Sequence, residues 1–208
     1  MEIKQSRENT KPRLQLAIHM ARKNCNVFVD SSFSQKSEHR AGAGSIITNP
    51  KRHNNIALIQ AFNMSNMNID DSKHAELWGA TLILEQLKNF NVQKLTFDCS
   101  FVKSRILDVL NNKLNEEKYN GDLFDRLRGA VANQNDMALC HVDRKETHIK
   151  LVDSFSRVAT KKQNVDRISA IVDQHGAPFI LHHMNDEGYI ARTMFFDAPD
   201  PMDGHHPI

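Results

Sequence analysis

Between residues 24 and 160, apolar segments with strand-like patterns alternate with segments of helical spacing in a defined order. Three strands joined by short turns are predicted at 24–30, 42–48 and 56–62. A long helix follows at 75–87, and its apolar face is broad. The remaining segments are strands at 93–98 and 137–142 and helices at 102–110, 123–133 and 151–160. The order β-β-β-α-β-α-α-β-α predicts an α/β fold with a five-stranded mixed sheet flanked by helices.

The charge divides the chain into parts. Residues 1–162 carry 25 lysines and arginines and 18 acids, whereas 163–208 carry two and seven, with five of the eleven histidines. We therefore expect a basic N-terminal helical appendage (1–24), a main domain (25–162) and an acidic, His-rich C-terminal extension (163–208), with candidate strands at 177–182 and 189–196. A basic body favours a polyanionic partner, and the extension is a candidate site for a protein partner or self-association.

Several classes of protein are disfavoured. No apolar run approaches the roughly 18 residues that a membrane helix needs, so we expect no membrane partner. The charged N-terminus lacks the apolar segment of a secretory signal. The three cysteines have no paired spacing and predict neither a disulfide framework nor a cysteine zinc site. We therefore expect a cytoplasmic protein.

Four acids stand where predicted strands end or helices begin. Asp30 closes the apolar run of the first strand, and Asp98 ends the fourth strand. Glu76 lies in the first turns of the long helix, and Asp153 lies near the start of the last helix. An acid beside a buried strand costs desolvation unless it is paired or binds a cation. Converging carboxylates remain ionised at neutral pH only where cations neutralise them.

An all-oxygen ligand set favours Mg²⁺ or Mn²⁺ over zinc. Two such ions, held roughly 4 Å apart, can activate a water and stabilise the leaving oxygen of a phosphodiester. Taken singly, each acid also has an ordinary interpretation as a helix cap, a turn residue or a solvated helix acid. The order of the four acids along the predicted elements favours a common site.

Residues 26–162 resemble the type 1 ribonuclease H domain of the ribonuclease H-like superfamily. The matching motifs are VFVDSS at 27–32, AGAG at 41–44, HAELWGA at 74–80, FDCSFV at 97–102 and LVDSFSRVA at 151–159. The resemblance implies a ribonuclease H-like fold in which Asp30, Glu76, Asp98 and Asp153 are catalytic and hold two Mg²⁺ or Mn²⁺ ions. Ser31 and Cys99 replace the Gly and Ser that the family usually has, and both are small.

The resemblance also implies contacts with substrate. Residues beside the acids are expected to bind nucleic acid: Ser32, Ser72, Lys73 and Ser100. Many members have a loop histidine that assists proton transfer, and two histidines compete for that role here. His148 is favoured over His141 because it is expected in the loop before Asp153, whereas His141 ends the fifth strand.

We expect an endoribonuclease that hydrolyses the RNA strand of RNA–DNA hybrids by two-metal-ion catalysis. One alternative is a nuclease of the same fold that acts on another nucleic acid, such as double-stranded RNA or branched DNA. Another is a nucleic-acid-binding or assembly protein with little or no turnover. The four acids argue against that last alternative, because a scaffold has no physical need for converging carboxylates.

Overall fold

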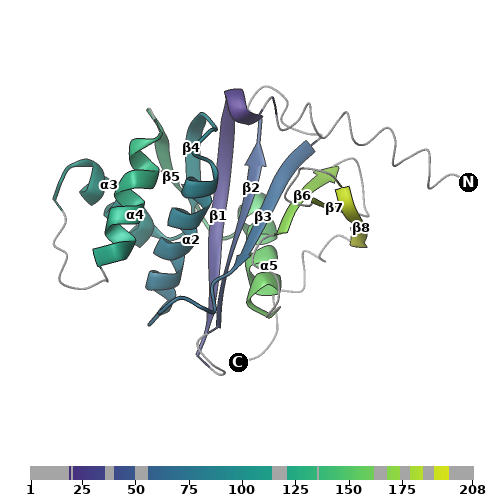
Figure 1. Cartoon of the computed structure of the whole chain (residues 1–208), viewed down its shortest axis with the longest axis horizontal. Coiled ribbons are helices and arrows are strands. Elements are labelled where there is room, and N and C mark those ends of the chain that lie inside the picture. Colours follow the sequence, from purple (N-terminus) through teal and green to yellow (C-terminus); the bar gives the residue numbers. More distant parts are fainter. Residues whose placement is uncertain are drawn as a thin grey trace, which may run out of the picture.

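The structure is a computed structural model that describes residues 19, 21–35, 40–49, 56–113, 121–134, 136–161, 168–173, 179–184 and 190–196. The described strands form one sheet in the order β5-β4-β1-β2-β3-β6-β7-β8 (Figure 1). The strands are β1 (Cys25–Ser34), β2 (Arg40–Thr48), β3 (Ile56–Asn63), β4 (Val92–Phe97), β5 (Ala138–His141), β6 (Ile168–Asp173), β7 (Phe179–Met184) and β8 (Ile190–Phe196). The helices are α2 (Ser72–Gln86), α3 (Ser100–Leu110), α4 (Gly121–Ala132) and α5 (Thr147–Lys161).

The predicted five-stranded sheet is confirmed as the part from β3 to β5. β1, β2 and β3 pair antiparallel, as short connections between strands favour. β4 pairs parallel with β1, and β5 pairs parallel with β4. Parallel strands end at the same edge of a sheet, so the segments that follow β4 and β5 emerge beside each other.

Side chains of the central strands alternate between two apolar layers. Val27 and Val29 of β1 are buried in the same layer as residues of α2, α3 and α4. Phe28, between them, belongs to a smaller layer with Val152 and Ala159 of α5. Helices α2, α3 and α4 therefore cover one face of the sheet and α5 covers the other (Figure 1).

Glycines on β2 bring α5 close to the sheet. A Cβ atom on Gly44 would lie 2.9 Å from the backbone oxygen of Val152, and one on Gly42 would lie 2.6 Å from the backbone nitrogen of Thr160. Side chains at these two positions would hold α5 away from the strand. The glycine-rich strand thus fixes the position of the helix that carries Asp153.

Three further strands extend the sheet beyond the predicted five. β6 pairs antiparallel with β3, and β7 and β8 continue the sheet outward. The segments expected at 177–182 and 189–196 correspond to β7 and β8, while β6 was not anticipated. Of the predicted N-terminal appendage, residues 21–23 are described and helical, and Ala21 is buried in the main core. Residue 19 is also described and helical, whereas 1–18 and 20 lie outside the described part of the chain.

Candidate metal centre

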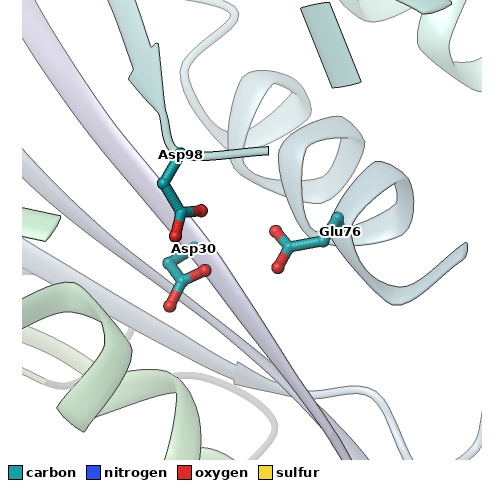
Figure 2. Close-up of side chains that lie close together, drawn as sticks. All are labelled: Asp30, Glu76 and Asp98. Atoms are coloured by element: carbon teal, nitrogen blue, oxygen red, sulfur yellow. The ribbon is translucent and has the colours of Figure 1, made fainter. Parts of the chain in front are cut away.

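Asp30, Glu76 and Asp98 come together from three elements (Figure 2). One carboxylate oxygen of each lies within 4.8 Å of the others. Phe28 of β1 pairs with Thr96 of β4, so Asp30 and Asp98, each two residues further on, lie side by side. Glu76 is the fifth residue of α2 and points toward them from the helix. We call Asp30, Glu76 and Asp98 the acidic trio.

The start and the packing of α2 position Glu76. Asp71 caps the helix, because its Oδ1 accepts a hydrogen bond of 2.7 Å from the backbone N–H of His74. One turn later, Gly79 lets the helix approach the sheet: a Cβ there would overlap the Ser31 hydroxyl and lie 2.9 Å from Ala43 Cβ. Ser31, which stands where the resembled family usually has Gly, therefore uses space that Gly79 leaves open.

The acidic trio is buried, and burial makes its negative charge costly. Burial raises the pKa of Asp30 to about 7, and the charges of Asp98 and Asp153 contribute. The pKa of Glu76 lies well above its ordinary value, chiefly because of burial and then because of the charge of Asp30. Glu76 and Asp30 also hydrogen-bond to each other, which raises the pKa of Glu76 and lowers that of Asp30. In the absence of a cation, burial and mutual repulsion therefore favour the protonated forms of Asp30 and Glu76.

Two oxygens of the acidic trio fit a bound cation. Oδ1 of Asp30 and Oδ1 of Asp98 are both buried and have no hydrogen-bond partner among the described residues. A buried carboxylate oxygen without a partner is costly, and a divalent ion would satisfy both oxygens at once. The ligand atoms are all oxygens, which suits Mg²⁺ or Mn²⁺.

Asp153 lies outside the acidic trio. It stands in the second turn of α5, and both of its oxygens pair with Arg157, at 2.9 Å from Nε and 2.9 Å from a terminal nitrogen. Its charge nevertheless contributes to the raised pKa of Asp30. Its role as a fourth ligand stays a prediction.

The predicted nucleic-acid contacts lie within four residues of an acid of the trio in the sequence. Ser72 and Lys73 are exposed in the first turn of α2, and Ser100 is the exposed first residue of α3. The Lys73 ammonium lies 5.8 Å from the centre of the Phe101 ring. Ser32 is half-buried on β1 and pairs with Gly42. Their binding roles stay predictions.

The two candidate histidines occupy different surroundings. His148 is in the first turn of α5 rather than in a loop; its ring stacks on Phe28 at 4.4 Å, and its Nδ1 lies 2.8 Å from Glu146. His141 ends β5, and its Nε2 lies 2.8 Å from the backbone oxygen of Asp98. Neither proton-transfer role is tested by this arrangement.

Sequence reasoning did not single out Arg144, which lies in the segment between β5 and α5. Its Nε donates a hydrogen bond of 2.6 Å to Oδ2 of Asp98. This bond and the charge of Asp98 raise the pKa of the guanidinium, and Asp30 and Glu76 add to the effect. A cation soon after the fifth strand emerges at the edge of the sheet where β4 ends and Asp98 follows, but its partner depends on the path of the segment between β5 and α5.

The chain matches no protein-family model and no curated protein by sequence. Solved structures do match. The foamy viral protease-reverse transcriptase in complex with an RNA/DNA hybrid is 11% identical with a TM-score of 0.51; the match covers 66% of this chain and 20% of that one. A ribonuclease H1 from the archaeon Halobacterium salinarum is 13% identical with a TM-score of 0.50; the match covers 65% of this chain and 96% of the archaeal one. The PFV ribonuclease H domain is 13% identical with a TM-score of 0.51; the match covers 65% of this chain and 93% of that domain.

These likenesses and the sheet order define the class: the chain contains a domain with the ribonuclease H-like fold. The chain spans about a fifth of the foamy viral protein that it matches. None of the described helices is long and apolar enough to cross a membrane.

Proposed function

We propose that this protein is a metal-dependent nuclease that hydrolyses the RNA strand of RNA–DNA hybrids. The observation that carries the proposal is the acidic trio with its two unpaired buried oxygens, on Asp30 and Asp98. A nucleic-acid-binding scaffold gains nothing from burying three carboxylates together, whereas a cation site requires it. The foamy viral protein of similar fold was solved with an RNA/DNA hybrid, which supports this class of substrate.

In the proposed mechanism, Asp30, Glu76 and Asp98 would hold the divalent ions, and Asp153, which pairs with Arg157 in the structure, would be a further ligand. When bound, the ions supply Lewis-acid stabilisation of the charge that develops on the attacking and leaving oxygens. Because the pKa values of Glu76 and Asp30 are raised, metal binding would favour their ionised forms and would release protons. The buried setting of the trio keeps these interactions strong, because water screens them little.

Cationic side chains of α2, which carries Glu76, and of α3, which follows Asp98, are candidates for holding the substrate. Lys73 of α2 and Arg105 of α3 approach the same ring, that of Phe101, at 5.8 and 5.4 Å from its centre. Lys73 adjoins Ser72 at the start of α2, and Arg105 lies five residues after Ser100 in α3. Phosphate contacts of this kind position a duplex without reading its sequence, while short polar groups can contact the 2′-hydroxyls of RNA.

A second candidate function is cleavage of another nucleic acid by the same acidic trio. A foamy viral protease-reverse transcriptase of similar fold was also solved with double-stranded DNA, which supports this second candidate. A shared fold does not determine the substrate.

The test compares Asp98→Asn with a matched control, Asp125→Asn. Asp125 is an exposed acid of α4 that pairs with Arg128, so its substitution makes the same chemical change away from the trio. Asp98→Asn keeps the side-chain size but removes a ligand charge. Turnover of RNA–DNA hybrid with Mg²⁺ or Mn²⁺ should therefore fall at least about a hundredfold, on the order of 3 kcal/mol. Asp125→Asn should cleave like the wild type.

Labelled RNA–DNA hybrid, double-stranded RNA, double-stranded DNA and single strands are incubated with each protein. Cleavage of the hybrid alone supports the proposal, and Asp98-dependent cleavage of another substrate supports the second candidate. Binding without any cleavage supports a scaffold. Full activity of Asp98→Asn would exclude a role for the acidic trio in catalysis.

A further inference from the structure

Arg144 makes an unusual ion pair with the acidic trio. Its side chain is 83% exposed, whereas that of Asp98, which it contacts at 2.6 Å, is 3% exposed. An exposed arginine usually pairs with an exposed acid, and such pairs contribute little to stability. Here the guanidinium instead reaches over the edge of the sheet to a buried carboxylate.

The ion pair occupies one oxygen of a predicted metal ligand. Arg144 contacts Oδ2 of Asp98, while Oδ1 of the same carboxylate is buried without a hydrogen-bond partner among the described residues. The guanidinium is thus a cation held where a metal ion would otherwise balance the charge. A divalent ion that draws both oxygens of Asp98 into its shell has to compete with it.

The backbone on both sides of Arg144 is anchored. The N–H of Val142 donates to the oxygen of Phe97 at 3.0 Å, which ties the segment to the end of β4. On the other side, Asp143 accepts hydrogen bonds from the N–H groups of Lys145, at 2.8 Å, and Glu146, at 3.0 Å. With the backbone anchored, the long, exposed side chain of Arg144 can change its partner by rotation about its own bonds. A displaced guanidinium would then stay close to the trio.

We propose that Arg144 is a displaceable counter-ion of the metal centre. It pairs with Asp98 before a divalent ion binds, and the metal then displaces it toward a phosphate oxygen of the nucleic acid. A guanidinium suits this exchange, because it forms similar hydrogen bonds with carboxylates and phosphates. The transfer of Arg144 to a phosphate rests on the proposed nuclease function, whereas its pairing with Asp98 and its displacement by a metal ion do not.

Calorimetric titration of Mg²⁺ and of Mn²⁺ without nucleic acid tests whether a metal ion competes with Arg144 for Asp98. Arg144→Ala should bind the ions about fivefold more tightly than the wild type, because an ion pair with an exposed partner opposes binding by about 1 kcal/mol. Lys145→Ala is the matched control, since it removes the same charge from the neighbouring exposed position. The affinity of Lys145→Ala for the ions should stay within about twofold of the wild-type affinity. Arg144→Lys keeps the charge, so its affinity for the ions should lie between those of the wild type and Arg144→Ala.

Thermal melting in chelator provides a second measurement. Arg144→Ala should melt at a lower temperature than Lys145→Ala without metal, because the charge of the trio is then less balanced, and saturating Mg²⁺ should remove the difference. If Arg144→Ala binds metal no more tightly than Lys145→Ala, the counter-ion role is wrong.

Cleavage at saturating Mg²⁺ tests the transfer to phosphate. The kcat of Arg144→Ala on hybrid should fall about tenfold relative to Lys145→Ala, since a donor to phosphate charge is lost. Unchanged kcat and KM would mean that the displaced arginine does not engage the substrate. If the wild type cleaves no nucleic acid, the proposed function fails, and the two metal-binding measurements still decide whether Arg144 is the counter-ion.

Discussion

Asp30 is the residue at which burial and charge conflict most directly. It is 3% exposed, and its pKa of about 7 means that the folded, metal-free protein holds a proton that the unfolded chain releases near pH 4. Between these values the folded state binds more protons than the unfolded state, so its stability falls as the pH rises.

We expect the free energy of unfolding of the metal-free protein to fall, by on the order of a few kcal/mol, as the pH rises from about 4 through 7. Denaturant unfolding in chelator across this range measures the slope. Saturating Mg²⁺ should flatten the curve near neutral pH, because the ion stabilises the ionised trio. Asp30→Asn should make the slope smaller, since the amide does not titrate whereas Glu76 still does. An equal slope in wild type and Asp30→Asn would show that other groups cause it.

Asp30 and Asp98 could be predicted from the sequence because each stands at the end of an apolar strand run, and Glu76 because it lies in the first turns of the long helix. The approach of Asp30 to Asp98 could be predicted because parallel strands end at one edge. The pairing of Arg144 with Asp98 could not, since it depends on the path of a five-residue polar segment between β5 and α5. The pairing of Asp153 with Arg157 is a local contact one helical turn apart that the sequence permits but does not require.

At the scale of elements, apolar periodicity predicted the order of helices and strands better than their ends. The last helix was expected to begin at Leu151, where its apolar face becomes continuous. It begins at Thr147, because Oε2 of Glu146 accepts a hydrogen bond of 2.9 Å from the N–H of Ile149. This earlier start places His148 in the helix, against Phe28, instead of in a loop.

The stability of the fold depends on how closely α2 packs against the sheet at Gly79. Gly79→Ala should lower the free energy of unfolding by about 1–3 kcal/mol, because the added methyl group meets Ser31 and Ala43. Gly129→Ala, in α4, has no atom within 4 Å of the added Cβ and should raise stability by about 0.5–1 kcal/mol. Urea unfolding of the two variants compares the same substitution in two helices.

The two glycine variants should also differ in metal binding. Displacement of α2 moves Glu76 away from Asp30, so Gly79→Ala should bind Mg²⁺ more weakly, whereas Gly129→Ala should match the wild type. Equal stability of the two variants would mean that α2 does not depend on the close approach at Gly79.

At the scale of the whole molecule, the element order was sufficient to predict the five-stranded part of the sheet, but not its full width. The segment ISAIVD at 168–173 is apolar enough to form a strand, yet nothing in its sequence specifies β3 as its partner. Pairing with β3 is a long-range contact, and its register extends from Ile56 opposite Asp173 to Ala61 opposite Ile168. The predicted role of 163–208 in binding a partner or in self-association stays a prediction.

The extension covers the edge of β3, and this arrangement yields a last prediction. A chain that ends at residue 162 leaves the outer backbone groups of β3 without the partners that β6 provides. An exposed strand edge of this kind pairs readily with another chain. We therefore expect the shortened protein to associate as its concentration rises, to a greater degree than the full chain, and to melt at a lower temperature. Sedimentation velocity and thermal melting measure both changes.

Magnesium binding separates edge exposure from general unfolding in this experiment. The acidic trio lies on β1, on α2 and directly after β4, and none of these elements pairs with β6. If the shortened protein keeps its fold, it should bind Mg²⁺ with the affinity of the full chain while it self-associates. A shortened protein that binds Mg²⁺ normally and sediments and melts like the full chain would mean that the β3 edge is protected without the extension, and that β6, β7 and β8 serve some purpose other than covering it.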